Sequence, residues 1–225
     1  MLLLRCVVGC GEVDLRKTPS VPDLLAGENL PAAPQQNRSR ERRDLLLAAG
    51  LDCFRVKGFE ATTIEEIAGK AGVATGGFYL YFTTKTQLLL VLMQTLVERL
   101  AAVDLQFAAG TSPRAALRRF LKQAFAADLH YAGALRAWHE AASADEGLAK
   151  KQARIQRWTT ARVQAVLERL LRLPHGRRKV DVPSLAQIID RLFWQLLRDS
   201  AVLPPKTMTR LVLAASDLLF HALFT

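Results

Sequence analysis

Residues 43–93 read RDLLLAAGLDCFRVKGFEATTIEEIAGKAGVATGGFYLYFTTKTQLLLVLM, and this stretch decides the fold. In its first part apolar residues recur at helical spacing, so that Leu47, Leu51 and Phe54 share one face. Gly58 then ends the pattern, as a C-cap glycine does. The stretch therefore begins with a predicted amphipathic helix that stops at Gly58.

Two short helices joined by a glycine turn are predicted after Gly58. Thr62 and Thr63 are each followed, three residues later, by a glutamate, and both pairs fit a capping box that begins a helix. The sequence Ala-Gly-Val at 71–73 interrupts that helix, and residues 74–82 can form the next one. Two helices with a tight turn between them are typical of a helix-turn-helix.

The rest of the chain is predicted to be helical too. Thr84 and Gln87 form a further capping box before a long helix from Lys85 to about Phe107, and Gly110 ends it. Further helical patterns cover roughly 113–128, 131–142, 145–172, 183–201 and 206–224. No stretch alternates as a strand does, so the sequence predicts an all-α fold.

Composition divides the chain into three predicted parts. Residues 1–37 contain four prolines and little periodicity, which favours a flexible N-terminal extension. Residues 38–93 hold the helix-turn-helix, and residues 94–225 form a second, helical domain. Half of the 225 residues are hydrophobic, which is enough to bury a sizeable core.

The charge of the chain is a weak guide to its partner. The net charge is +10, as a nucleic-acid-binding protein often has. However, residues 1–93 hold 11 basic and 10 acidic residues, whereas residues 113–225 hold 19 basic and 9 acidic residues. The excess of positive charge therefore lies outside the predicted helix-turn-helix domain of residues 38–93. A DNA-binding role must therefore rest on the motif. The surplus could favour an anionic effector such as a fatty acid or acyl thioester, although a solvated helix surface explains it more simply.

The cysteines and the N-terminus indicate a soluble cytoplasmic protein without a metal site. Three cysteines are a sparse and odd set, as expected in a reducing compartment. Cys6 and Cys10 lack the second ligand pair that a structural metal site needs. The apolar start is interrupted by Arg5 and is too short for a signal-peptide core, and we predict no membrane partner.

Residues 43–93 resemble the N-terminal domain of the TetR (tetracycline repressor) family of transcription regulators. The resemblance is specific because many landmarks recur at fixed spacing. They are Ala49, Phe54, Gly58, Phe59, Thr62, Thr63, Ile67, Ala68, Ala71, Gly72, Val73, Gly76, Tyr79, Phe82, Lys85 and Leu88. Beyond residue 93 only the layout of helices is familiar.

The resemblance implies that residues 74–82 form the helix that enters the major groove of DNA. Phe78 and Phe82, at i and i+4, are expected to face the core. By resemblance Thr63, Tyr79 and Lys85 contact phosphates, while Ala74 departs from the usual serine cap. The arginines at 38, 40, 42 and 43 lie before or at the predicted helix start, where a basic arm can reach DNA. The predicted DNA-binding residues are Arg43, Thr62, Thr63, Thr75, Gly76, Gly77, Tyr79, Leu80, Tyr81 and Lys85.

By resemblance the helical domain of residues 94–225 binds a ligand and dimerises, and it contains candidate residues for both roles. Tryptophans can line an apolar cavity, although each is more often ordinary core, and the predicted ligand residues are Trp138, His139, Trp158 and Trp194. By resemblance the last two helices pair with those of a second copy. The predicted dimer residues are Ile188, Leu192, Leu196, Leu211, Ala215, Leu218 and Ala222.

The predicted function is that of a dimeric transcription regulator, most simply a repressor, that binds a palindromic operator in double-stranded DNA and is released by a small-molecule effector. The sequence offers no glycine-rich phosphate loop, nucleophile elbow or metal-ligand array, so we predict neither an enzyme nor a cofactor. The better rival is a ligand-binding helical bundle that no longer binds DNA, because the predicted base-reading residues offer few side-chain donors.

Overall fold

The computed structural model describes residues 20–32, 35–103, 112–173, 175–177, 179–199 and 203–224. All regular elements in these ranges are helical, which confirms the all-α prediction. They are α1 (Asn37–Lys57), α2 (Ile64–Lys70), α3 (Thr75–Phe78), α4 (Lys85–Ala101), α5 (Pro113–Asp128), the short 3-10 helix η2 (Leu129–Tyr131), α6 (Ala132–Ala144), α7 (Glu146–Leu170), α8 (Val182–Asp199) and α9 (Pro205–Phe224).

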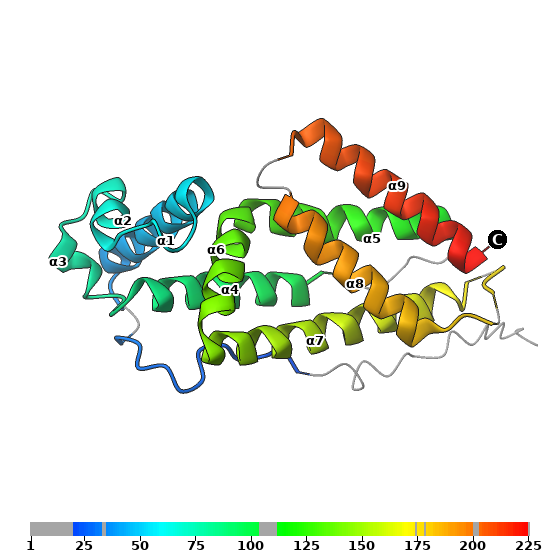
Figure 1. Ribbon diagram of the computed structural model, residues 1–225, viewed down its shortest axis with the longest axis horizontal. Coiled ribbons are helices and arrows are strands. Elements are labelled where there is room, and N and C mark those ends of the chain that lie inside the picture. Colours follow the sequence, from blue (N-terminus) through cyan, green and yellow to red (C-terminus); the bar gives the residue numbers. More distant parts are fainter. Residues whose placement is uncertain are drawn as a thin grey trace, which may run out of the picture.

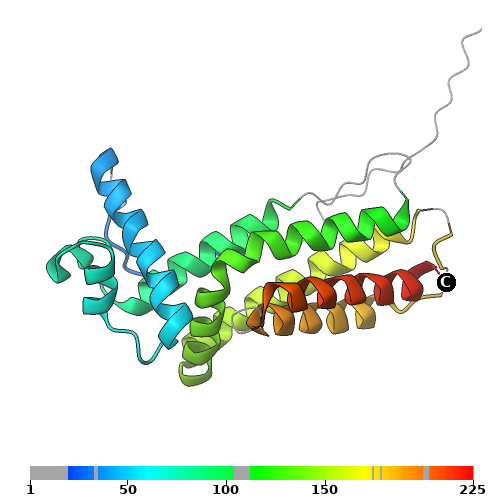
Figure 2. The same ribbon diagram turned by 90° about the horizontal axis from the view of Figure 1, so that it is seen from above.

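The helices form a small lobe and a larger body (Figures 1 and 2). Helices α1 to α3 make the lobe at one end, and α4 leads from the lobe into the body that α5 to α9 complete. The predicted boundary at residue 93 falls inside α4, where Met93 is fully buried. One apolar cluster includes Leu46 of α1, Leu92 of α4 and Trp158 of α7, so packing is continuous across that boundary.

Local signals set the ends of the first helix. Gly58 adopts a φ of 80° and its N–H donates to Phe54 O at 2.9 Å, so α1 ends where the sequence predicts. Its start differs, because α1 begins at Asn37. The arginines predicted to form an arm before the helix therefore lie on its first two turns, from Arg38 to Arg43.

Helix α6 joins the body to the lobe by packing directly on α1. Gly133 makes this close approach possible: a Cβ added there would lie 2.3 Å from Leu51 O, a backbone atom of α1. Glu140 adds a polar contact, since its Oε2 accepts the N–H of Phe59 at 2.6 Å. The lobe of α1 to α3 therefore packs on α6 with the two backbones in close contact, so a larger side chain at Gly133 would not fit.

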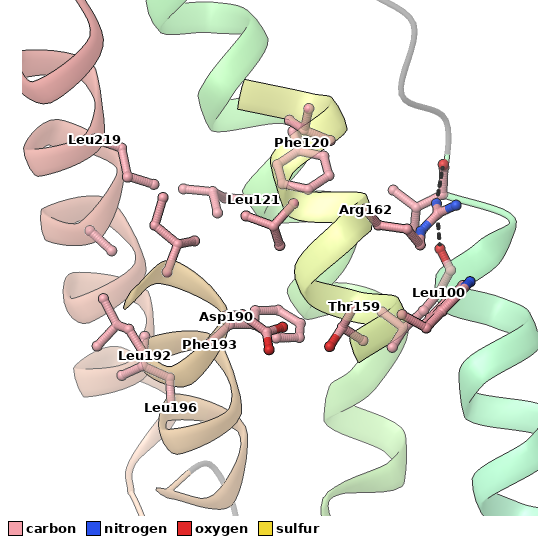
Figure 3. Close-up of a pocket in the computed structure, with 16 residues that line it drawn as sticks. Leu100, Phe120, Leu121, Thr159, Arg162, Asp190, Leu192, Phe193, Leu196 and Leu219 are labelled. Atoms are coloured by element: carbon pink, nitrogen blue, oxygen red, sulfur yellow. Dashed lines mark hydrogen bonds between the residues drawn. The ribbon is translucent and has the colours of Figure 1, made fainter. Parts of the chain in front are cut away.

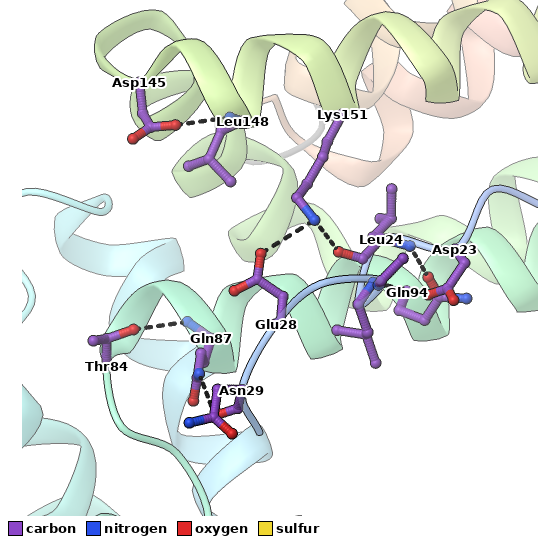
Figure 4. A network of polar contacts seen from close by, with 12 residues as sticks. Asp23, Leu24, Glu28, Asn29, Thr84, Gln87, Gln94, Asp145, Leu148 and Lys151 are labelled. Carbon is purple, nitrogen blue, oxygen red and sulfur yellow. Dashed lines mark hydrogen bonds and ion pairs between the residues drawn. The ribbon is translucent and has the colours of Figure 1, made fainter. Parts of the chain in front are cut away.

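The prediction of a flexible extension is wrong for residues 20–32, which form a strap across the body (Figure 4). Leu24 is fully buried, and its N–H donates to Gln94 Oε1 of α4 at 2.8 Å. Lys151 of α7 donates to Leu24 O and pairs with Glu28 at 3.2 Å. Gln87 of α4 donates to Asn29 O at 3.0 Å. Residues 1–19 and 33–34, which also belong to the predicted extension, lie outside the described ranges.

Replacing Lys151 with methionine is expected to loosen the strap. The ammonium is mostly buried and serves two acceptors, so its loss should cost about 1–3 kcal/mol of folding free energy. The matched control is Lys150→Met, which removes an exposed pair with Glu146 and should cost under about 1 kcal/mol. Urea unfolding, with proteolysis of residues 20–32, measures the difference. Equal stability of the two variants would contradict a role for Lys151 in holding the strap.

Candidate nucleic-acid interface and ligand cavity

A capped helix, a glycine turn and a single helical turn build the candidate DNA-reading unit. Thr63 Oγ1 accepts the N–H of Glu66 and Glu66 Oε2 accepts the N–H of Thr63, both at 3.2 Å, so the predicted capping box forms at Thr63. Gly72, with a φ of 66°, makes the turn. Helix α3 is shorter than predicted: it covers Thr75–Phe78, and the chain continues in turns rather than as helix to residue 82.

Two phenylalanines fix α3 to the core and leave the opposite side in solvent. Phe78 and Phe82 are fully buried, with ring centroids 5.7 Å apart, as the i, i+4 spacing predicts. Tyr79 is 50% and Leu80 67% exposed. Large exposed side chains beside a fully buried anchor are what an interaction surface requires.

The two glycines of α3 differ in their surroundings. A Cβ at Gly76 would meet no atom within 4 Å, whereas one at Gly77 would lie 2.5 Å from the Val73 side chain. A glycine inside a helix costs about 1 kcal/mol relative to alanine. No neighbouring residue of the described chain requires a glycine at position 76, because a side chain there would meet no other atom. The exposed backbone at Gly76, beside half-buried Thr75, is therefore accessible to a partner.

Two predicted DNA contacts are wrong because their side chains are buried. Thr62 is 1% exposed, and its hydroxyl donates to Gly58 O at 2.6 Å, inside the turn after α1. Tyr81 is 8% exposed, and its hydroxyl shares a 2.9 Å hydrogen bond with Ser39 Oγ of α1. Both residues position the reading unit on α1 instead of facing outward.

Lys85 and Arg43 already have contacts within the chain. Lys85 Nζ donates to the carbonyl oxygens of Phe59 at 2.8 Å and of Glu60 and Thr62 at 3.1 Å, and it lies 4.6 Å from the Phe59 ring centroid. A phosphate contact by Lys85 stays a prediction. To bond to a phosphate, the ammonium would have to give up one of its three hydrogen bonds to these carbonyl oxygens. The Arg43 guanidinium lies over the Phe82 ring at 5.5 Å, at the edge of the same unit.

Ion pairs connect α1 to α2 and shift the carboxyl groups involved. Lys70 bonds to Asp52 at 3.1 Å and lowers the pKa of that carboxyl, and Lys57 likewise lowers the pKa of Glu66. Burial raises the pKa of the Cys53 thiol on the same face of α1. Because these pairs are exposed to solvent, they contribute little to the stability of the fold.

An apolar cavity of about 70 Å³ lies in the body between α4, α5, α7, α8 and α9 (Figure 3). Its walls are mainly leucine, valine and aromatic side chains. They include Leu100, Phe120, Leu121, Trp158, Phe193 and Leu219. Of the four predicted ligand residues only Trp158 lines this cavity, and it does so as a buried wall.

Two charged residues, neither singled out by the sequence, also line the cavity. Arg162 Nη2 donates to the carbonyl oxygens of Leu100 and Ala101 at 3.1 and 3.2 Å, at the C-terminal end of α4. Its guanidinium lies 5.1 Å from the Trp158 ring, and burial lowers its pKa. Asp190 of α8 is 3% exposed. Burial raises the pKa of Asp190, although the hydrogen bond from the Thr160 hydroxyl works against the rise.

The other predicted ligand residues line a different feature. Trp138, His139 and Trp194 border an open groove of about 990 Å³ between α6, α7 and α8. Both indole N–H groups are already used, by Gln152 and Thr159 respectively. The structure thus brings three of the four predicted residues together, but separates them from Trp158.

The predicted dimer residues also divide. Ile188, Leu192, Leu211 and Leu218 are exposed, at 61, 42, 38 and 69%, on α8 and α9 at one edge of the molecule (Figure 2). Leu196 and Ala215 are buried and line the cavity of their own chain, so they present little surface to a partner. Ala222 is half-buried. Leu213, 44% exposed, belongs to the apolar surface that the sequence analysis did not include.

Comparison with known proteins identifies the lobe. Residues 46–92 match the family model described as bacterial regulatory proteins, tetR family. The chain is 44% identical over 50 residues to the HTH-type transcriptional regulator YerO of Bacillus subtilis, and 32% identical over 83 residues to the HTH-type transcriptional regulator YuxN of the same organism. The matches cover 22 and 36% of this chain but only 17 and 28% of those relatives.

The whole architecture has counterparts among solved structures. The ketosteroid transcriptional regulator KstR2 of Mycobacterium tuberculosis superposes with a TM-score of 0.61 at 18% identity, over 87% of this chain and 98% of that one. At this identity the likeness shows the fold alone. The relatives that match the lobe are transcriptional regulators and not enzymes. The lobe, its landmarks and the family model together show that residues 46–92 are a regulatory domain of the tetR family.

Proposed function

We propose that the protein is a cytoplasmic, DNA-binding transcription regulator, which binds a palindromic operator as a homodimer and is released by a small molecule in its helical body. The observation that carries the DNA-binding part is the exposure of Tyr79 and Leu80 on a unit whose Phe78 is fully buried. Thr63, Tyr79 and Arg43 would hold phosphates, and Thr75, Gly76, Gly77 and Leu80 would face base edges.

Few side-chain donors face outward from α3 and the turn after it, so a ligand-binding protein without DNA binding remains the rival function. Thr75 and Tyr79 carry hydroxyls, whereas Gly76, Gly77 and Leu80 offer only shape and apolar contact. Such a surface suits thymine methyl groups and a closely approaching sugar-phosphate backbone. A helical protein that binds ligands but has lost DNA binding would carry the same α3, so a direct measurement must separate the two.

Replacing Tyr79 with alanine is expected to lower affinity for operator DNA by about tenfold or more, because a half-exposed ring and a phosphate donor are both lost. Fluorescence anisotropy with DNA from upstream of the chain's own gene, against unrelated competitor DNA at moderate salt, measures the change. The folded state should be unaffected, since half of the side chain is already in solvent.

The control is Val56→Ala, which removes a similarly exposed apolar side chain, 64% in solvent, from the end of α1 that is seated on α6. It should leave DNA affinity unchanged. Absence of any specific binding by the unmodified chain would favour the ligand-binding rival. An unchanged affinity of the Tyr79→Ala variant would show that the turn after α3 does not contact DNA.

The apolar edge of α8 and α9 supports the homodimer. Residues 206–224 of α9 are long and apolar enough to cross a membrane, yet only 28% of the relevant window is buried in the chain. Contiguous apolar surface of this kind needs a cover. A second copy related by a two-fold axis would cover it and set two α3 helices about one DNA turn apart.

Arg162 is the contact through which the cavity can influence α4 and, through α4, the reading head. Its guanidinium both lines the cavity and caps the negative end of the α4 dipole. A ligand that displaces Arg162 from these carbonyls would alter the position of α4 and the spacing of the two heads. Ligand binding and DNA binding are coupled in this way only if the ligand binds one of two dimer conformations more tightly than the other.

The Arg162→Leu variant is expected to loosen the C-terminal turn of α4. Charged hydrogen bonds of this kind contribute about 1.5–3 kcal/mol, so hydrogen exchange in residues 98–103 should accelerate about tenfold or more. Arg157→Leu, on an exposed position of the same helix, is the control and should leave that segment unchanged. If exchange in residues 98–103 does not change in the Arg162 variant, the proposed link between cavity and α4 is wrong.

A further inference from the structure

A single carboxylate oxygen in the cavity lacks a hydrogen-bond partner. Asp190 projects from α8 toward Thr159 of α7 (Figure 3). Its Oδ2 accepts a 2.9 Å hydrogen bond from Thr160 Oγ1. Its Oδ1 has no partner among the described residues and is shielded from solvent. An unpaired buried acceptor is costly to fold, so the position is suited to a group from outside the chain.

The other polar groups of the cavity are already used. The Thr159 hydroxyl donates to Gln156 O at 3.1 Å and lies 3.3 Å from Trp194 Nε1, from which it accepts. The Arg162 guanidinium donates to the end of α4. A trapped water needs about two to four polar partners. Among the described lining residues Asp190 Oδ1 is the one free acceptor, so a ligand donor satisfies it better than water does.

We propose that the cavity selects small apolar molecules that carry one hydrogen-bond donor, a hydroxyl or an amine, which bonds to Asp190 Oδ1. This inference rests on the proposed role of the helical body as an effector-binding domain. The apolar part would lie against the side chains of Leu121, Phe193 and Leu219, and the donor would face α8. A carboxylate ligand is disfavoured because it would meet Asp190 in a poorly solvated space where Arg162 is occupied.

Four matched probes test the selectivity: benzyl alcohol, benzylamine, toluene and benzoate, each titrated into the full chain by calorimetry and by tryptophan fluorescence. Transfer from water into an apolar cavity on its own favours toluene over the other three. We expect the alcohol and the amine to bind about tenfold or more tightly than toluene, and benzoate to bind weakest. Toluene or benzoate binding as tightly as benzyl alcohol, or no binding by the alcohol and the amine, would overturn the proposal.

Variants assign the preference to Asp190. In Asp190→Leu, which removes the acceptor at similar size, toluene should bind more tightly than benzyl alcohol, and the thermal midpoint should not fall because an unpaired buried carboxylate is gone. In Val163→Ala, the matched control in the same wall, affinity for both probes should change by a similar factor. A preference for the alcohol that survives in Asp190→Leu would overturn the proposal.

A second substitution covers the case in which the leucine variant does not fold. Asp190→Asn keeps the shape and an acceptor oxygen but loses the charge, so it should bind benzyl alcohol and lose about tenfold of its affinity for benzylamine. Unchanged binding of benzylamine would overturn the role of Asp190. No probe measurement contains DNA, so failure of this proposal and failure of the DNA-binding proposal are distinguishable.

Discussion

The Gly133→Ala variant is expected to be less stable than the unmodified chain by about 1–3 kcal/mol, although alanine is the better helix former. The added Cβ would lie 2.3 Å from Leu51 O and 2.8 Å from Arg55 N. Both are backbone atoms of α1, so a change of side-chain rotamer cannot relieve the clash and the two helices must move apart. Because α6 seats the reading head, DNA affinity should fall together with stability.

Gly69→Ala is the matched control for Gly133→Ala. Gly69 also lies within a helix, α2, but a Cβ added there meets no atom within 4 Å. The control should gain up to about 1 kcal/mol from helix propensity. Urea unfolding of the two variants should therefore give changes of opposite sign. A Gly133→Ala variant as stable as the unmodified chain would show that α1 and α6 are not packed as closely as their backbones indicate.

Much of the fold could be predicted because its signals are local. A capping box needs a hydroxyl and a carboxylate three residues apart, and a C-cap needs a glycine, so Thr63 and Gly58 could be identified from the sequence. The burial of Phe78 and Phe82 followed from helical spacing. Each of these features depends on neighbours within one or two turns.

The errors arose where distant residues decide the environment. Thr62 and Thr63 fit the same local pattern, but packing after α1 buries Thr62. Tyr81 is tied to Ser39, 42 positions earlier, and the strap depends on Lys151, 127 positions after Leu24. The prolines indicated a loose segment because composition cannot show which surface a segment lies on.

The division of the last helices into inner and outer faces could not be predicted either. Leu192 and Leu196 belong to one apolar stripe, yet Leu196 is 6% exposed and Leu192 is 42% exposed. A helix that is apolar over a wide arc can pack on the chain's own core with one side and present the other side to solvent or a partner. The helical period alone does not show which apolar residues lie on which side. Asp190 had a weak signal, since an acidic residue between Ile189 and the apolar residues after Arg191 is unusual at a core position.

Replacing Leu218 with arginine is expected to convert the proposed dimer into monomers. Leu218 is 69% exposed on α9, the most exposed of the apolar side chains on that edge, so the folded monomer should tolerate the change. In a two-fold interface the substitution occurs twice, and each unpaired buried charge costs roughly 3–5 kcal/mol. The dimer dissociation constant should rise by about a hundredfold or more. Sedimentation at micromolar concentration measures the change.

DNA binding should fall with the dimer, because a monomer holds one half-site where the dimer holds two. Affinity for a palindromic operator should approach that for an isolated half-site, and the two should differ little in the variant. Val56→Arg places the same charge on a 64% exposed position of α1 and should leave the dimer intact. A Leu218→Arg protein that remains dimeric would place the interface elsewhere, and the apolar edge of α8 and α9 would then need another cover.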